Sequence, residues 1–167
     1  MQQFLECALE ASRIGEEIIA TEFKQNAFKI EIKEDQTPVT EVDVAVEKAI
    51  YAHISKNFPD HGFYGEEEGQ RNMDADYIWL IDPIDGTKAF VRGRPFFSCQ
   101  IALMHKGELV LGVSVAPSFN GGERIYAVKG QGAFKKGKRL SVSDIADFSQ
   151  AVFSSGNLKK LALDREK

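Results

Sequence analysis

Two aspartates in the middle of the chain, Asp82 and Asp85, follow an apolar run at residues 78–81. The apolar run predicts a buried strand. Pro83 cannot donate to a strand ladder and restricts the residue before it, so we expect the chain to leave the sheet here. A carboxylate at the end of a buried strand needs a cation or several donors to offset its desolvation, and Mg²⁺ takes oxygen ligands. The sequence therefore predicts a magnesium site at this strand end.

Gly86 and Thr87 come next and predict an anion site beside the metal. Gly86 permits a tight turn, and Thr87 can cap a short helix over residues 88–91. Backbone N–H groups at a helix start bind anions, and this pair suits a single phosphate better than a nucleotide. A hard metal next to a phosphate site is what a metal-assisted phosphatase needs.

Three more acids, Asp43, Glu66 and Glu67, are candidates for the same site. Taken alone, the run GEEEG at residues 65–69 is most simply a solvated loop. Asp43 alone is most simply a helix-start carboxylate, because it stands three residues after Thr40, the expected N-cap. We find no Cys/His cluster for zinc, no nucleophile elbow and no glycine loop of the nucleotide-binding type.

Composition excludes several other classes of protein. Hydrophobic residues make up 43% and charged residues 28% of 167 residues, as in an ordinary globular domain. The net charge of −4 argues against a nucleic-acid or anionic-membrane partner. No apolar run approaches the ~20 residues of a membrane helix, and Glu6 comes too early for a signal peptide. We therefore expect a cytoplasmic protein in which Cys7 and Cys99 are reduced and buried.

The elements that must position these residues follow from hydrophobic periodicity. Apolar residues at helical spacing predict helices at residues 3–25 and 41–57. Alternating or β-rich runs predict strands at residues 28–32, 63–64, 98–104, 109–116 and 124–128, then a meander through Phe134 and Leu140, with residues 151–155 as a further candidate. The predicted fold class is α+β, with the two N-terminal helices packed on one face of a mostly antiparallel sheet.

Three motifs in this order resemble the inositol monophosphatase family of Mg²⁺-dependent phosphomonoesterases: TPVTEVD (Thr37–Asp43), GEE (Gly65–Glu67) and WLIDPIDGT (Trp79–Thr87). The stretch YAVKGQGAF (Tyr126–Phe134) is also similar to the family. The resemblance implies hydrolysis of a small phosphate monoester, histidinol phosphate or inositol monophosphate, by a water that the metal activates. The stretch DGTKAFVRG (Asp85–Gly93) is more similar to the histidinol-phosphate phosphatase branch.

The resemblance also implies a role for each site residue. The implied metal ligands are Glu66, Glu67, Asp82, Asp85 and the backbone carbonyl of Ile84, with Asp82 bridging a first and a second Mg²⁺. The implied catalytic residues are Glu66, Asp43 and Thr87, the last two orienting or deprotonating the attacking water. The implied substrate-binding residues are Gly86, Thr87, Lys88 and Arg92. For Lys88 and Arg92, a role as solvent-exposed helix charges is an equal alternative.

The resemblance further implies that residues 1–167 form the N-terminal, metal-binding half of a layered αβαβα fold, with the C-terminal domain absent. The family's later WDxAAG-like motif, whose aspartate completes the second metal site, has no match after Ala151. We therefore expect two or three ions with the second one weakened, and a homodimer that completes the site. The alternative is a catalytically impaired metal-binding domain with a structural role or no activity.

Overall fold

A computed structural model describes residues 1–25, 27–34, 38–152 and 154. Its α-helices are α1 (Gln2–Gln25), α2 (Glu41–Asn57) and α3 (Thr87–Phe90), and single 3₁₀ turns lie at Phe119–Gly121 and Phe148–Gln150. Its strands are β1 (Ile30–Ile32), β2 (Pro38–Thr40), β3 (Gly62–Gly65), β4 (Gln70–Arg71), β5 (Tyr77–Asp85), β6 (Ser98–His105), β7 (Glu108–Ala116), β8 (Glu123–Val128), β9 (Gly132–Lys135) and β10 (Lys138–Arg139).

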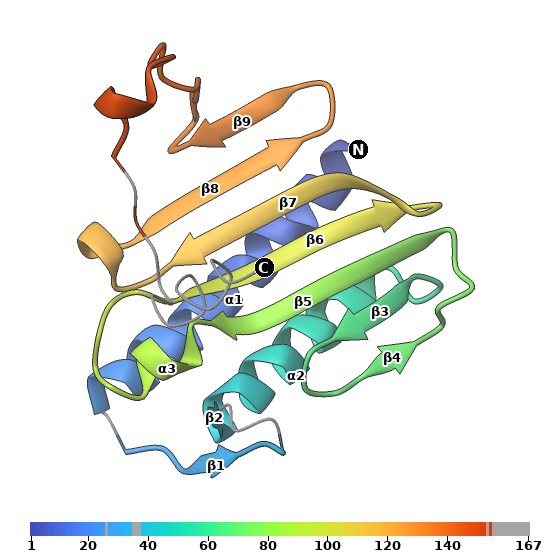
Figure 1. The fold of residues 1–167 in the computed structure, drawn as a ribbon. Helices are drawn as coiled ribbons and strands as arrows, with labels where there is room; N and C mark the ends of the chain where they lie inside the picture. The colour runs from blue at the N-terminus through green and yellow to red at the C-terminus, as the bar shows by residue number, and fades with distance from the viewer. Residues whose placement is uncertain (26, 35–37, 153, 155–167) are drawn as a thin grey trace, which may run out of the picture.

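Eight strands form one sheet in the order β10-β9-β8-β7-β6-β5-β3-β4. Of the strands that the structure describes, only β3 and β5 pair in parallel within it, and β1 and β2 form a separate antiparallel pair. Helix α1 packs against β6 and β7 and helix α2 against β5, so both long helices cover the same face (Figure 1). This arrangement confirms the predicted α+β class with helices on one side of a mostly antiparallel sheet.

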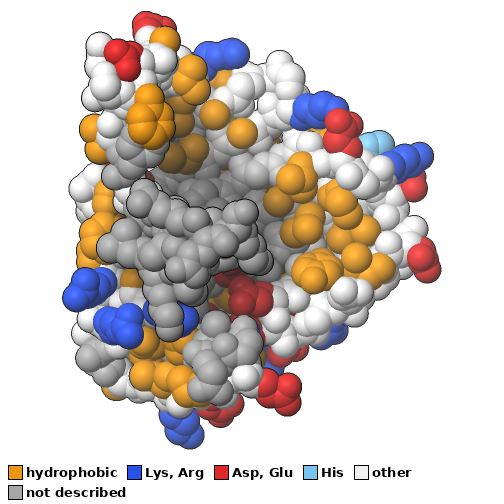
Figure 2. Space-filling model, in the orientation of Figure 1, with side chains coloured by type: hydrophobic (Ala, Val, Ile, Leu, Met, Phe, Trp, Pro, Cys, Tyr) orange, Lys and Arg blue, Asp and Glu red, His pale blue; other side chains and the backbone are white. Residues whose placement is uncertain are grey.

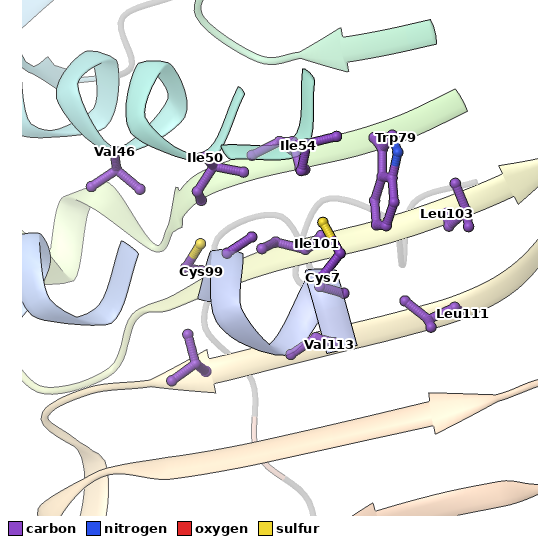
Figure 3. Packing of buried hydrophobic residues seen from close by; sticks show 14 of the residues in the cluster. Cys7, Val46, Ile50, Ile54, Trp79, Cys99, Ile101, Leu103, Leu111 and Val113 are labelled. Carbon is purple, nitrogen blue, oxygen red and sulfur yellow. The ribbon is translucent and has the colours of Figure 1, made fainter. Parts of the chain in front are cut away.

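The core lies between these helices and the sheet (Figure 3). Trp79 on β5 is fully buried, and its indole N–H donates to His61 Nδ1 at 3.0 Å. Cys7 on α1 and Cys99 on β6 are both free and buried, as predicted. Burial of this apolar face holds β5 rigidly, and β5 carries the predicted aspartates at its end. Among the described residues, no helix has the length and apolarity to cross a membrane.

Helix α2 begins as its sequence predicts. Thr40 is the N-cap, its hydroxyl accepts a hydrogen bond from the Val42 amide, and Asp43 completes a capping box. A capping box satisfies two of the donors that a helix start leaves open. The cap therefore fixes the Asp43 carboxylate at the end of α2 that approaches α3 and the end of β5.

Two local predictions around the aspartates were wrong. Strand β5 does not end at Asp82 but continues to Asp85, because a β-bulge between these residues places Pro83 where no ladder donor is needed. The cap of α3 is Gly86 and not Thr87, which is instead the first helical residue. Gly86 has φ of 97°, and a Cβ on it would lie 2.7 Å from the Phe96 carbonyl oxygen, so the turn requires glycine.

Two other predicted segments lie partly outside the residues that the structure describes. Ala151 and Val152 are in no strand, and residues 153 and 155 lie outside the described residues. Thr37 of the first motif lies outside them as well. Strand β1 is present as predicted but shorter, and all three of its residues are exposed.

Candidate metal and phosphate site

The bulged end of β5 brings Asp82 to the edge of the core. Asp82 pairs with Gln100 on β6, and its neighbours Ile81 and Ile84 are buried. Its Oδ1 is buried and has no hydrogen-bond partner among the described residues. A buried carboxylate oxygen without a donor is costly, so this position calls for a positive charge.

Carboxylates gather around Asp82. Burial, followed by the negative charge of Glu66, a carboxyl hydrogen bond with Glu66 and the negative charges of Asp85 and Asp43, raises the pKa of Asp82 to about 7. Burial also raises the pKa of Asp43, against the hydrogen bonds that it accepts from Thr40. Acids that share one site resist ionising together unless a cation joins them. The cluster therefore has the donor chemistry of a hard divalent cation, which prefers carboxylate oxygens.

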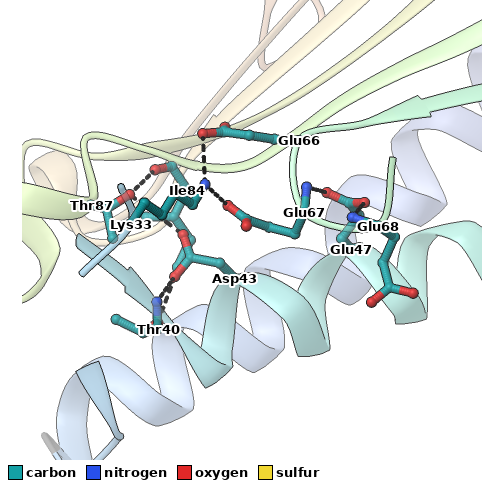
Figure 4. A network of polar contacts seen from close by, with 9 residues as sticks. All are labelled: Lys33, Thr40, Asp43, Glu47, Glu66, Glu67, Glu68, Ile84 and Thr87. Carbon is teal, nitrogen blue, oxygen red and sulfur yellow. Dashed lines mark hydrogen bonds and ion pairs between the residues drawn. The ribbon is translucent and has the colours of Figure 1, made fainter. Parts of the chain in front are cut away.

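Thr87 joins this cluster to helix α2 (Figure 4). Its hydroxyl lies 2.9 Å from the Ile84 carbonyl oxygen and 3.4 Å from Asp43 Oδ1. The other oxygen of Asp43, Oδ2, accepts hydrogen bonds from the Thr40 amide at 2.9 Å and the Thr40 hydroxyl at 2.6 Å. Asp43 is 2% exposed. The pair therefore places a buried carboxylate, which accepts from the Thr87 hydroxyl, next to Asp82.

Lys33 supplies a positive charge to the other side of the cluster. Its ammonium lies 2.6 Å from Glu67 Oε1 and 3.5 Å from Glu66 Oε1 (Figure 4). Burial raises the pKa of Glu67, and the Lys33 hydrogen bond opposes that effect. Within the described part of the chain, no three His, Cys, Asp or Glu side chains are arranged to hold one metal ion. The Lys33 ammonium partly neutralises the negative charges of Glu66 and Glu67 at this side of the cluster.

Glu47 on α2 is a residue that the sequence analysis missed. It is fully buried, and its carboxylate accepts the Glu67 amide at 2.9 Å and the Glu68 amide at 2.7 Å. The signal was present in the sequence, because Glu47 stands one helical turn after Asp43 and beside Val46 on the apolar stripe of α2. A charged residue on an apolar helix face predicts a buried partner.

Two cavities meet at the carboxylates. The smaller one, about 290 Å³, is lined by Pro38, Glu66, Asp82, Ile84, Asp85, Gly86, Thr87 and Lys88. The larger one, about 640 Å³, shares Glu66 and Asp82 and extends over small and apolar residues of the sheet face that the helices leave open. Figure 2 views that face, with hydrophobic side chains gathered on it.

The smaller cavity thus unites most of the predicted site residues. Glu67 lies beside it, held by Lys33, and Asp43 reaches it through Thr87. Arg92 does not line it, because the residue lies in the exposed turn after α3. The residues present fit a divalent cation at Asp82, next to a pocket large enough for a phosphate group.

Comparison with known proteins assigns the chain and its fold to a family. The family model described as "Inositol monophosphatase family" matches residues 1–160, so the chain belongs to that family. A histidinol-phosphatase from Chlorobaculum parvum is 39% identical over 148 residues, which cover 89% of this chain and 56% of that protein. A fructose-1,6-bisphosphatase/inositol-1-monophosphatase from Thermotoga maritima is 43% identical over 119 residues, covering 71% and 45%.

A solved structure supports the same assignment. The extragenic suppressor protein suhB from Bartonella henselae superposes with a TM-score of 0.81 at 29% identity, covering 86% of this chain and 55% of that one. The chain therefore spans about half the length of these relatives. The predicted family and the predicted fold, helices packed on a mostly antiparallel sheet, are confirmed.

Proposed function

We propose that this chain carries the metal-binding and water-activating half of a Mg²⁺-dependent phosphomonoesterase. The observation that carries the proposal is the unpartnered, buried Oδ1 of Asp82 within a cluster of four acids, Asp43, Glu66, Asp82 and Asp85. Family membership supports it, because relatives are named histidinol-phosphatase and inositol-1-monophosphatase.

The proposed ligands are Glu66, Asp82, Asp85 and the backbone carbonyl of Ile84, with Glu67 joining once Lys33 releases it. Mg²⁺ held there would lower the pKa of water and neutralise charge on the phosphoryl group. We expect two or three ions, the second held weakly by Asp85.

The rest of the proposed reaction belongs to the chain's own groups. Asp43 Oδ1 accepts the proton that the attacking water loses, relayed by the Thr87 hydroxyl 3.4 Å away. The start of α3, at Gly86 and Thr87, holds the phosphate with backbone N–H groups that a helix start leaves open. Phosphoryl transfer depends mainly on positioning and charge neutralisation, which is what this arrangement offers.

The proposed substrate is a small phosphate monoester, histidinol phosphate before inositol monophosphate. The test measures phosphate released from both compounds with Mg²⁺ and with chelator. Turnover that requires Mg²⁺ is expected, and the faster substrate identifies the branch. Asp82→Asn controls for contaminating phosphatases. Release that persists in chelator and in this variant would overturn the proposal.

The second candidate is a metal-binding domain that is inactive by itself. The cavity of about 640 Å³ beside Asp82 favours it, because that cavity lies on a sheet face that carries no second layer among the described residues. Stabilisation by Mg²⁺ without any phosphate release would select this candidate.

The homodimer and the cytoplasmic location remain predictions. Sedimentation of the chain with and without Mg²⁺ tests the predicted homodimer.

Replacing Lys33 should strengthen metal binding. In Lys33→Met, no ammonium competes for the carboxylates of Glu66 and Glu67, and no positive charge repels the incoming cation. We expect Mg²⁺ affinity to rise roughly fivefold, about 1 kcal/mol, in calorimetric titrations. Lys48→Met is the matched control, because among the described residues the Lys48 ammonium forms an ion pair with Glu68 alone, at 3.5 Å. Weaker Mg²⁺ binding by Lys33→Met would show instead that Lys33 supports the site.

Replacing Arg92 should affect substrate and leave the metal alone. Arg92→Ala removes an exposed cation from the turn that follows α3, whose charge attracts the anionic ester from outside the cavity, and we expect KM for the phosphate ester to rise about 3- to 10-fold. Mg²⁺ affinity should stay at the wild-type value, since Arg92 does not line the cavity that holds the acids. Arg94→Ala, an exposed cation two residues further on, is the control. If Arg92→Ala lowered Mg²⁺ affinity by the same factor as it raised KM, the assignment of Arg92 to substrate binding would be refuted.

A further inference from the structure

The acidic turn at residues 66–68 has its backbone tied to the interior of the protein. Glu47 lies on α2, one turn after Asp43, with its side chain fully buried. One of its carboxylate oxygens accepts the Glu67 amide at 2.9 Å, and the other accepts the Glu68 amide at 2.7 Å (Figure 4). Charge-assisted hydrogen bonds of this kind are stronger than neutral ones.

Gly65 leaves the space that this carboxylate fills. A Cβ at residue 65 would lie 1.9 Å from Glu47 Oε1, so no other residue type fits without displacing Glu47. Displacing the carboxylate would cost free energy, because each of its two oxygens accepts a hydrogen bond from a backbone N–H group. Glycine before the acidic turn and glutamate on α2 therefore form one structural unit.

Building on the proposed function, we infer that Glu47 is a positioning residue that sets the direction in which Glu66 and Glu67 project toward the cation. The two amides that Glu47 holds belong to Glu67 itself and to its neighbour Glu68. Helix α2 thus controls the site at two successive turns: Asp43 contacts Thr87, and Glu47 orients the acidic turn. Groups that orient metal ligands by hydrogen bonds typically contribute 10- to 100-fold to metal affinity, which here gives an expected effect of about tenfold or more.

The first test changes the carboxylate without changing its size. In Glu47→Gln, only one oxygen accepts, and the amide NH₂ faces one of the two backbone donors. We expect Mn²⁺ affinity, measured by EPR titration of the full chain, to fall about tenfold or more. Gly65→Ala should reproduce this loss with Glu47 still present. Glu68→Gln removes an acid from the same turn without touching the buried carboxylate, and it should bind Mn²⁺ with nearly wild-type affinity.

A second measurement needs no variant. In the metal-free wild-type chain, the amide protons of Glu67 and Glu68 should exchange with solvent at least tenfold more slowly than in an unstructured peptide. Exchange at the peptide rate would overturn the inference even if both variants failed to fold.

The possible results distinguish the positioning role of Glu47 from the proposed metal site on which it rests. Tight Mn²⁺ binding by the wild type and unchanged binding by Glu47→Gln would overturn the positioning role alone. A merely structural Glu47 would produce that result, with lower resistance to urea and the same metal affinity. A wild-type chain that binds no Mn²⁺ would overturn the proposed function and this inference together.

Discussion

Asp82→Asn is expected to abolish Mg²⁺-dependent stabilisation of the chain and to lower phosphate release by about a thousandfold or more. The carboxylate is the only one of the cluster that stands at the bulged end of β5 with a buried, unpartnered oxygen among the described residues. An asparagine keeps the shape of the side chain but removes the charge that a divalent cation requires. Thermal melting with and without Mg²⁺ measures the first effect, and initial rates measure the second.

The same variant has a distinct effect on the metal-free protein. Because the pKa of Asp82 is raised in the folded chain to about 7, the folded state holds its proton more tightly than the unfolded state does. Stability from this group is therefore present below about pH 4 and is lost as the pH rises toward 7. Asp82→Asn should remove this loss, so that the variant without metal is more stable than wild type at pH 8.

Glu10→Gln is the control for that pair of experiments. Glu10 is an exposed acid on α1 that contacts Arg13 and lines neither of the two cavities at the carboxylates. Glu10→Gln should leave the Mg²⁺-dependent rise in melting temperature unchanged. Unchanged Mg²⁺ binding in Asp82→Asn would contradict the assignment of the metal site.

Asp43→Asn is expected to lower kcat about a hundredfold while Mg²⁺ affinity stays within about threefold of wild type. Asp43 uses both oxygens, Oδ2 for Thr40 at the helix cap and Oδ1 for the hydroxyl of Thr87. Asparagine has one acceptor oxygen, so the side chain cannot serve the cap and the proton relay at once. Rates at saturating substrate and Mg²⁺ measure the loss.

Two further variants isolate the relay. Thr87→Val removes the hydroxyl, and the double variant Asp43→Asn/Thr87→Val should lose little beyond either single change, because the two groups act as one unit. Glu41→Gln, an exposed acid in the same helical turn, should keep the wild-type kcat. If Asp43→Asn lost Mg²⁺ affinity and kcat in equal measure, Asp43 would be a metal ligand and not the proton acceptor.

The parts of the fold predicted from sequence are those with a local cause. Helical periodicity predicted α1 and α2, and the spacing of Thr40 and Asp43 predicted the capping box. Apolar and β-branched runs predicted the strands β6 and β7, which pair in an antiparallel manner. Each of these features depends on residues within a few positions of one another.

The features that were missed or wrong depend on distant partners. Strand β5 runs past Pro83 because β6 supplies a matching partner across the bulge, and no local pattern encodes that partner. Lys33 reaches Glu67 across 34 positions of sequence. Glu47 stands on the apolar stripe of α2, but its partners, the amides of Glu67 and Glu68, lie 20 and 21 positions away in the sequence. The resemblance to the family's motifs predicted which acids form the site. The ion pair of Lys33 with Glu66 and Glu67 was found only in the three-dimensional structure.

The most direct test of the metal site is anomalous diffraction from crystals of the chain soaked in Mn²⁺. We expect an anomalous peak within bonding distance of Asp82, with Glu66 or Asp85 also in contact and the Lys33 ammonium moved away from Glu67. A peak at another part of the molecule, or full Mn²⁺ soaking with no peak at the end of β5, would contradict it.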